Sequence, residues 1–168
     1  GGGGAGRAGA KGVVGGGCTG GSVGRDANGL EMAAGDVKKA SGRETHTIAA
    51  DLSSLAGITT MIESARGALG RIDILVNNAG SIRAGAFLEI PDAQWMEDWN
   101  LKLLGYVRAA RAVFPLMQEQ GGGRIINVIG SAGRQVIPNY LVGGAANAAL
   151  INFTKGLSDL GAQQGILG

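Results

Sequence analysis

Unbroken apolar runs separated by amphipathic segments constrain this fold most. The runs at 72–76 and 125–129 are aliphatic apart from one polar residue each, and they lack the alternation of a strand with one wet face. Strands and helices alternate from about residue 25 to residue 161. Because strands of this kind are buried on both faces, the pattern predicts an α/β fold with a doubly wound parallel sheet between two layers of helices.

Capping residues and glycines mark where the other elements begin and end. The sequence predicts, in chain order, a helix from Asp26 or Asn28 to Gly42, a strand at 45–50, a helix from Ser53 or Ser54 to Gly70, a long helix from Pro91 to about residue 118, and a last helix from near Tyr140 to residue 161. Ligands of such sheets bind outside the carboxyl ends of the strands, so Asp51, Ala79 and Ser131 are expected along one edge.

The first 24 residues have a different composition from the rest of the chain. They contain 13 of the 33 glycines, and such a tract loses much backbone entropy when it becomes ordered. We therefore expect residues 1–24 to be poorly ordered and residues 25–168 to form one domain.

Composition excludes several classes of function. One cysteine, Cys18, and one histidine, His46, are too few for a structural zinc site, so no metal is expected. The net charge is +2 with no basic cluster and 4% aromatic residues, which argues against a nucleic-acid partner. No apolar run has the roughly 18 residues of a membrane span, and a cytoplasmic location is expected.

Residues 71–80, RIDILVNNAG, resemble the central strand of the short-chain dehydrogenases/reductases. Four further segments resemble that family in the same order, so that the resemblance covers roughly residues 23–166: 23–26, 50–52, 121–133 and 147–166. The resemblance implies a Rossmann-like fold and an oxidoreductase that moves a hydride between NAD(P) and a small carbonyl or alcohol substrate.

The resemblance also implies cofactor-binding residues, which are Asp51, Asn77, Ala79 and Gly80, with Arg25 after the second strand. An arginine there favours NADP over NAD, although Asp26 beside it weakens that preference.

The catalytic positions depart from the family pattern. Ser131 stands where the family has its serine, but Lys102 stands at the asparagine position and Asn147 at the lysine position. Gly143 occupies the tyrosine position, and the nearest tyrosine is Tyr140, one helical turn earlier. The sequence therefore predicts Ser131, Tyr140, Lys102 and Asn147 as the catalytic group, with the last two exchanged and facing one shared cleft.

Each of these residues has a plainer alternative. Tyr140 can cover the start of a helix, Ser131 can cap a turn, and Lys102 and Arg25 can be surface charges. Asn100 is a second candidate for the family asparagine, but it lies two positions away and so on another helix face.

Both ends also depart from the family. Only eight residues separate Val14 from Val23, which leaves no room for the family's first helix or a normal second strand, and weak pyrophosphate binding follows. Family members continue with two more strands where this chain stops at Gly168. The domain is therefore expected to be truncated.

Two functions fit these observations. The first is an NAD(P)-dependent oxidoreductase. The alternative is an inert Rossmann remnant that associates with itself or with a full-length relative, because the family forms dimers and tetramers through helices that match residues 92–118 and 140–161.

Overall fold

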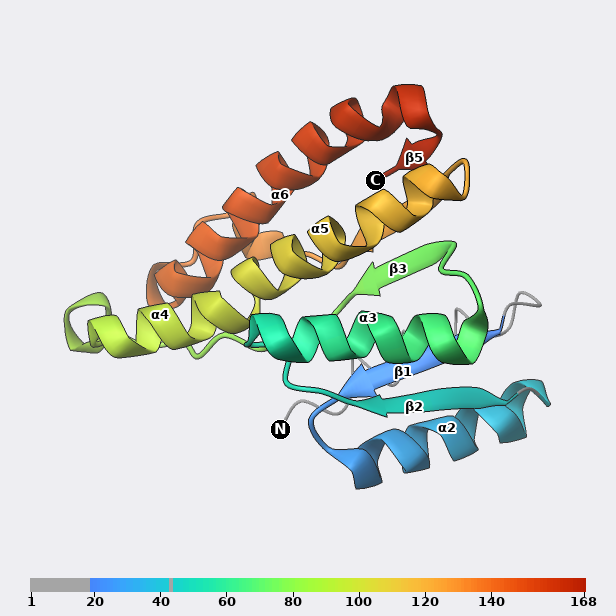
Figure 1. The fold of residues 1–168 in the computed structure, drawn as a ribbon. Coiled ribbons are helices and arrows are strands. Elements are labelled where there is room, and N and C mark those ends of the chain that lie inside the picture. Colours follow the sequence, from blue (N-terminus) through green and yellow to red (C-terminus); the bar gives the residue numbers. More distant parts are fainter. Residues whose placement is uncertain (1–18, 43) are drawn as a thin grey trace. The chain divides into compact units, whose positions relative to one another are not determined.

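The computed structural model describes residues 19–42 and 44–168, and the chain divides into two compact units, Gly1–Ile72 and Asp73–Gly168. The main elements are β1 (Gly20–Gly24), α2 (Ala27–Ser41), β2 (Thr45–Ala49), α3 (Leu55–Leu69), β3 (Ile74–Asn77), α4 (Asp92–Leu101), α5 (Leu103–Glu119), β4 (Gly123–Asn127), α6 (Leu141–Gly161) and β5 (Ile166–Leu167) (Figure 1). Short 3-10 turns are η1 (Phe87–Glu89), η2 (Ser131–Gly133), η3 (Pro138–Tyr140) and η4 (Ala162–Gln164). The alternation of strands and helices confirms the predicted α/β class.

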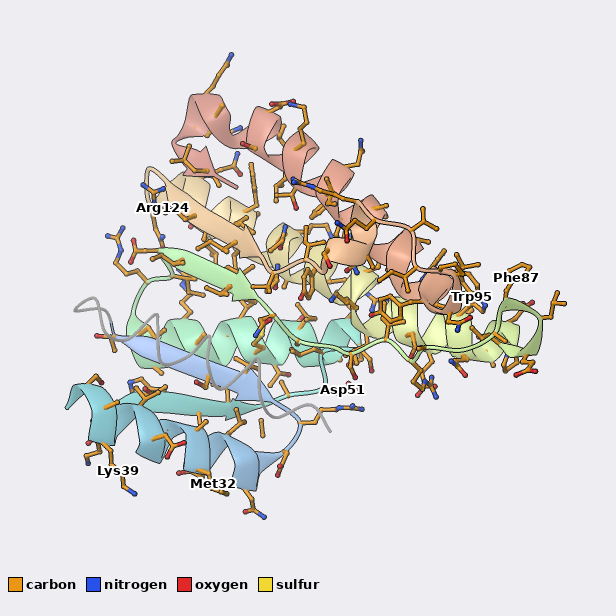
Figure 2. The ribbon with its side chains drawn as sticks, turned by 180° about the vertical axis from the view of Figure 1, so that it is seen from behind. Met32, Lys39, Asp51, Phe87, Trp95 and Arg124 are labelled. Atoms are coloured by element: carbon orange, nitrogen blue, oxygen red, sulfur yellow. The ribbon has the colours of Figure 1, made fainter. Side chains whose placement is uncertain are left out.

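In the first unit, β1 and β2 form a parallel pair between α2 and α3 (Figures 1 and 2). Buried aliphatic residues from both helices and from β2 make the core of this unit: Ala33, Val37, Ile48, Ile58, Met61 and Ile62. The helix–sheet–helix layering predicted from the sequence is therefore present here.

Strand β1 differs from the sequence prediction. We expected no normal second strand, yet Gly20–Gly24 is a regular strand, and it lies within the segment for which we expected poor order. Its parallel pairing with β2 supplies backbone partners that outweigh the poor strand propensity of glycine. Residues 1–18, which hold most of the segment that leaves no room for the family's first helix, lie outside the described residues.

The predicted helix ends are confirmed in this unit. The Ser54 side chain accepts a hydrogen bond from the backbone N–H of Gly57 at 3.0 Å and so caps α3. Gly42 follows α2 with φ of 70°, a left-handed conformation that glycine adopts without steric cost.

In the second unit, β4 lies between β3 and β5, and both pairings are parallel. Helices α5 and α6 pack against each other and against these strands. The most buried side chains come from both helices and from two of the strands: Val113, Met117, Ile125, Val142, Leu150 and Ile166.

The long helix predicted from Pro91 is two helices in the structure. Helices α4 and α5 meet at Lys102, the residue between them. The buried face of α5 includes Tyr106, which is 2% exposed, whereas Leu104 of the same helix is 39% exposed. The Tyr106 hydroxyl donates a hydrogen bond to the Val128 carbonyl at 3.1 Å, which lets a tyrosine occupy the core.

This burial predicts an alkaline loss of stability. Burial raises the pKa of Tyr106 from 10.0 to about 12, so the unfolded chain releases this proton first and the free energy of unfolding falls as pH rises from 10 to 12. Two pKa units correspond to roughly 2–3 kcal/mol. Tyr106→Phe should lose about 1 kcal/mol at neutral pH with its hydrogen bond but should show a flatter decline above pH 10 in urea unfolding. Parallel pH curves for the two proteins would contradict this.

Candidate active site

Strands β3 and β4 end side by side. Asn77 pairs with Asn127 in the parallel register, and the backbone N–H of Val128 donates to the Asn77 carbonyl at 2.9 Å. The segments after the two strands, which carry Ala79 and Ser131, therefore leave the same edge of this sheet, as predicted. Asp51 follows β2 at the end of that strand in the first unit (Figure 2).

Asn77 is a buried residue whose side chain links β3 to β4. Its amide nitrogen donates to Asn127 Oδ1 at 2.9 Å and reaches the Tyr106 carbonyl at 3.5 Å. Asn127 in turn donates to the Thr154 hydroxyl on α6 at 2.8 Å. The first asparagine of the turn thus holds the strand ends and α6 together.

Gly80 brings the turn after β3 onto the junction of α4 and α5. Gly80 has φ of 96°, and a Cβ built on it would lie 3.3 Å from the Cβ of Lys102. The side chain of Lys102 is half-buried at this junction, and desolvation lowers the pKa of its ammonium. Lys102 is therefore not the freely solvated surface lysine of the plainer alternative.

The turn that begins with Ser131 packs directly against α6. A Cβ on Gly133 would lie 2.8 Å from the backbone carbonyl carbon of Asn147. A Cβ on Gly130 would lie 2.8 Å from the side-chain nitrogen Nδ2 of Asn147. Gly144 of α6 meets the Ala132 carbonyl oxygen in the same way, at 3.3 Å. Glycines on both sides thus bring exposed Ser131 close to buried Asn147.

Asn147 is 1% exposed, and its Oδ1 has no hydrogen-bond partner among residues 19–42 and 44–168. A buried acceptor without a donor costs about 1–3 kcal/mol, so a ligand or water that donates to it would be favoured. No hydrogen bond joins Lys102 to this atom in the described part of the chain. The predicted shared cleft of Lys102 and Asn147 therefore stays a prediction.

Tyr140 ends η3 directly before α6 and packs against a small apolar cluster of Ile82, Val142 and Ala146. Desolvation raises the pKa of its phenol, and the negative charge of Asp98 adds to the effect. Both effects disfavour the phenolate, so this phenol is a weaker acid than a free tyrosine side chain.

Asp98 of α4 is itself buried and paired with Arg83. Arg83 Nη2 lies 2.9 Å from Asp98 Oδ1, and the Arg83 backbone N–H donates to Oδ2 at 3.2 Å. This pair fastens the loop after Gly80 to α4, close enough to Tyr140 for the carboxylate to act on the phenol.

In the first unit, Asp51 closes the turn between β2 and α3. Its Oδ1 accepts from the Ser53 hydroxyl at 2.7 Å and from the Ser53 backbone N–H at 3.0 Å. These bonds, with a smaller contribution from the charge of Arg25, lower the pKa of the Asp51 carboxyl. Asp51 and Arg25 are exposed, so both are accessible to a ligand.

The sequence did not predict a packing role for the glycines at 130, 133, 143 and 144, or the effect of the Asp98 charge. A signal for the glycines was present, because paired glycines inside an amphipathic helix are unfavourable unless something packs on them. The side chain of the alternative candidate, Asn100, already has a partner in the structure. Its Oδ1 accepts a hydrogen bond from Arg108 at 2.8 Å. Among the described residues, no group of three potential metal ligands exists, and no helix is long and apolar enough to cross a membrane.

Comparison with known proteins shows the family of this chain. The family profile described as "short chain dehydrogenase" matches residues 1–167. The chain belongs to the short-chain dehydrogenase family. An acetoacetyl-CoA reductase from an Acinetobacter species is 40% identical over 121 residues, which are 69% of this chain and 47% of that protein. The chain spans about half the length of the curated relatives it matches.

Solved structures of family members are also similar. L-sorbose reductase from Gluconobacter frateurii, complexed with NADPH and L-sorbose, has a TM-score of 0.88 and 30% identity over 96% of this chain and 60% of its own. A xylitol dehydrogenase bound to NAD⁺ has a TM-score of 0.82 and 25% identity over 87% and 56%. These similarities confirm the Rossmann-like fold, of which the chain carries an incomplete copy.

The glycine contact between η2 and α6 gives a test of the site's packing. A methyl group in Gly133→Ala would meet the Asn147 backbone and Ile151, which lies 2.9 Å away, so the turn must shift. We expect a loss of about 1–3 kcal/mol in the free energy of unfolding, measured in urea. Gly156→Ala on α6, where a Cβ meets no atom within 4 Å, is the matched control and should gain up to about 1 kcal/mol. Equal effects of the two substitutions would refute the contact.

Proposed function

We propose that this chain is the nicotinamide-binding and catalytic part of an NAD(P)-dependent oxidoreductase that interconverts a carbonyl and an alcohol. The observation that carries this proposal is the shared sheet edge, from which the Asn77–Gly80 turn and Ser131 both emerge. Ligand sites of parallel α/β sheets form at such edges. The orphaned Oδ1 of Asn147, beside the Ser131 turn, supports a polar ligand there.

The residues at this edge fit a nicotinamide cofactor. Ala79 and Gly80 carry little or no side chain, so a ligand can approach the backbone closely. Asn77 supports this turn through its bonds to β4 rather than through a free side chain. In the first unit, Asp51 and Arg25 are the polar residues proposed to bind the adenosine half. When bound, the cofactor supplies or accepts the hydride.

The chain's own residues handle the substrate oxygen. Ser131 orients the carbonyl through its hydroxyl, and Tyr140 donates a proton to the oxygen as negative charge develops on it. Lys102 would offer a positive charge to the bound nicotinamide cofactor from the α4–α5 junction, and Asn147 would offer an amide from α6. Proton donation by Tyr140 corresponds to the direction of carbonyl reduction, for which an acid is needed.

The cofactor and substrate are proposed only as classes. The named relatives include an NADPH complex and an NAD⁺ complex, and Arg25 after β1 favours the extra phosphate of NADP. The reductases of acetoacetyl-CoA and L-sorbose suggest a small ketone as the substrate. We place the protein in the cytoplasm, because its one cysteine cannot form an intramolecular disulfide.

Self-association is a second candidate role and is compatible with the first. Two of the helices proposed to pair carry exposed apolar side chains, with Met96 of α4 65% and Leu160 of α6 60% exposed. Near α4, the ring of Phe87 packs edge-on against Trp95 with centroids 6.5 Å apart, and both residues are labelled in Figure 2. Such surfaces support a homodimer or homotetramer, or pairing with a full-length relative.

Tyr140→Phe tests the catalytic proposal. NADPH oxidation by the purified chain with acetoacetyl-CoA or L-sorbose should fall by about 10²-fold or more, because proton donation contributes about 10²–10⁴-fold. NADPH binding, measured by its fluorescence, should change little. If the parent chain neither binds nor oxidises NADPH, the inert, self-associating alternative is favoured. An active Tyr140→Phe variant would remove Tyr140 from the mechanism.

Lys102→Met tests the exchanged lysine. We expect a rise of about 10–200-fold in the KM for NADPH, the equivalent of one charge-assisted hydrogen bond. Burial lowers the pKa of Lys102, so its ammonium loses its proton at a lower pH than an ordinary lysine does. The parent chain should therefore lose NADPH affinity at a pH below the ordinary lysine pKa. The variant should show no such loss. Lys155→Met, at an exposed position on α6, is the control and should behave like the parent chain. If Lys102→Met also behaves like the parent chain, Lys102 has no role in the site.

A further inference from the structure

Two adjacent glycines, Gly143 and Gly144, stand in the first turn of α6. Glycine is the poorest helix former after proline, so a pair of them needs a reason. Positive φ is not the reason, because neither residue is among the glycines with that conformation. The reason must be close packing. At Gly144, a Cβ would lie 3.3 Å from the Ala132 carbonyl oxygen of the Ser131 turn.

For Gly143 the neighbour is the ring of Tyr140. A Cβ on Gly143 would overlap the ring atoms Cε1 and Cζ and would lie 2.6 Å from the phenol oxygen. No other residue at 143 can therefore coexist with the ring in this position. The hydroxyl end of Tyr140 lies over the bare backbone of Gly143, which is the position where the family carries its tyrosine.

The rest of the ring is held by apolar neighbours. Ile82 of the loop after β3, and Val142 and Ala146 of α6, form the buried cluster against which Tyr140 packs. The Tyr140 backbone N–H donates to the Ile137 carbonyl at 2.9 Å and fixes the residue in η3. The ring is thus confined between this cluster and the backbone of Gly143.

We propose that Gly143 is a positioning residue that seats the Tyr140 ring, so that the glycine at 143 and the tyrosine at 140 form one coupled feature of the active site. The phenol reaches the α6 surface from one turn upstream, and the missing side chain at 143 makes room for it. This inference rests on the proposed function only for the role of the phenol; the seat itself is a matter of packing.

A double-mutant cycle tests the seat. Gly143→Ala should lower the melting temperature of the parent chain, because the methyl group and the ring compete for one space. In a Tyr140→Ala background the same substitution should raise the melting temperature, since alanine is the better helix former. Gly156→Ala, where nothing packs, should raise it in both backgrounds. If Gly143→Ala acts with the same sign in both backgrounds, the seat is refuted.

A spectroscopic titration gives a readout that helix stability alone would not move. The chain has two tyrosines, so alkaline absorbance resolves two phenol steps, and Tyr140→Phe identifies the step of Tyr140. Gly143→Ala should displace the ring from its cluster and from Asp98, and so shift its pKa toward the ordinary value of about 10. The charge of Arg83, which is bound to Asp98, is unchanged by the substitution.

The outcomes separate the two proposals. An unchanged titration in Gly143→Ala would overturn the seat. A shifted titration with an equally shifted pH profile of NADPH oxidation, and no shift in Gly156→Ala, would support both the seat and the role of Tyr140. A shifted titration with an unaltered rate and pH profile would leave the seat in place and refute Tyr140 as the proton donor.

Discussion

A chain of half-buried hydrogen bonds links β3, β4 and α6 in the second unit, next to its candidate site. Asn77 of β3 donates to Asn127 of β4 at 2.9 Å, Asn127 donates to Thr154 of α6 at 2.8 Å, and the Thr154 hydroxyl donates to the Leu150 carbonyl at 2.7 Å. Buried amides are costly unless paired, so these bonds favour a single register of the two strands and a single position of the helix. The segments that carry Gly80 and Ser131 start from this link.

Backbone packing then brings the polar groups together. Glycines at 130, 133 and 144 let the Ser131 turn contact α6 around Asn147. Gly80 lets the loop after β3 contact the backbone of Lys102. A Cβ at 130 or 133 would lie 2.8 Å from an atom of Asn147, so the turn or its neighbour on α6 would have to shift. The precision of the site therefore depends on absent side chains as much as on the polar groups themselves.

The site could be predicted from the sequence in part. Ser131 and Ala79 were placed at one sheet edge because both follow apolar strands, and the structure agrees. The surroundings of Tyr140 could not be predicted, because Asp98 is 42 positions earlier in the chain and acts on the phenol only through the fold. Likewise, the orphaned Oδ1 of Asn147 depends on what the Ser131 turn leaves unpaired, which residue spacing does not reveal.

Local signals in the sequence determined the class of fold, the alternation of elements and most of the helix ends, because apolar periodicity, the Ser54 cap and Gly42 act within a few residues of chain. Tertiary structure decided what those signals left open. Pairing with β2 made a strand of the glycine-rich residues 20–24, and packing chose Tyr106 rather than Leu104 for the core of α5. It also laid the Tyr140 ring over Gly143. These outcomes depend on partners distant in sequence or on the space between side chains, and neither is written in the order of residues alone.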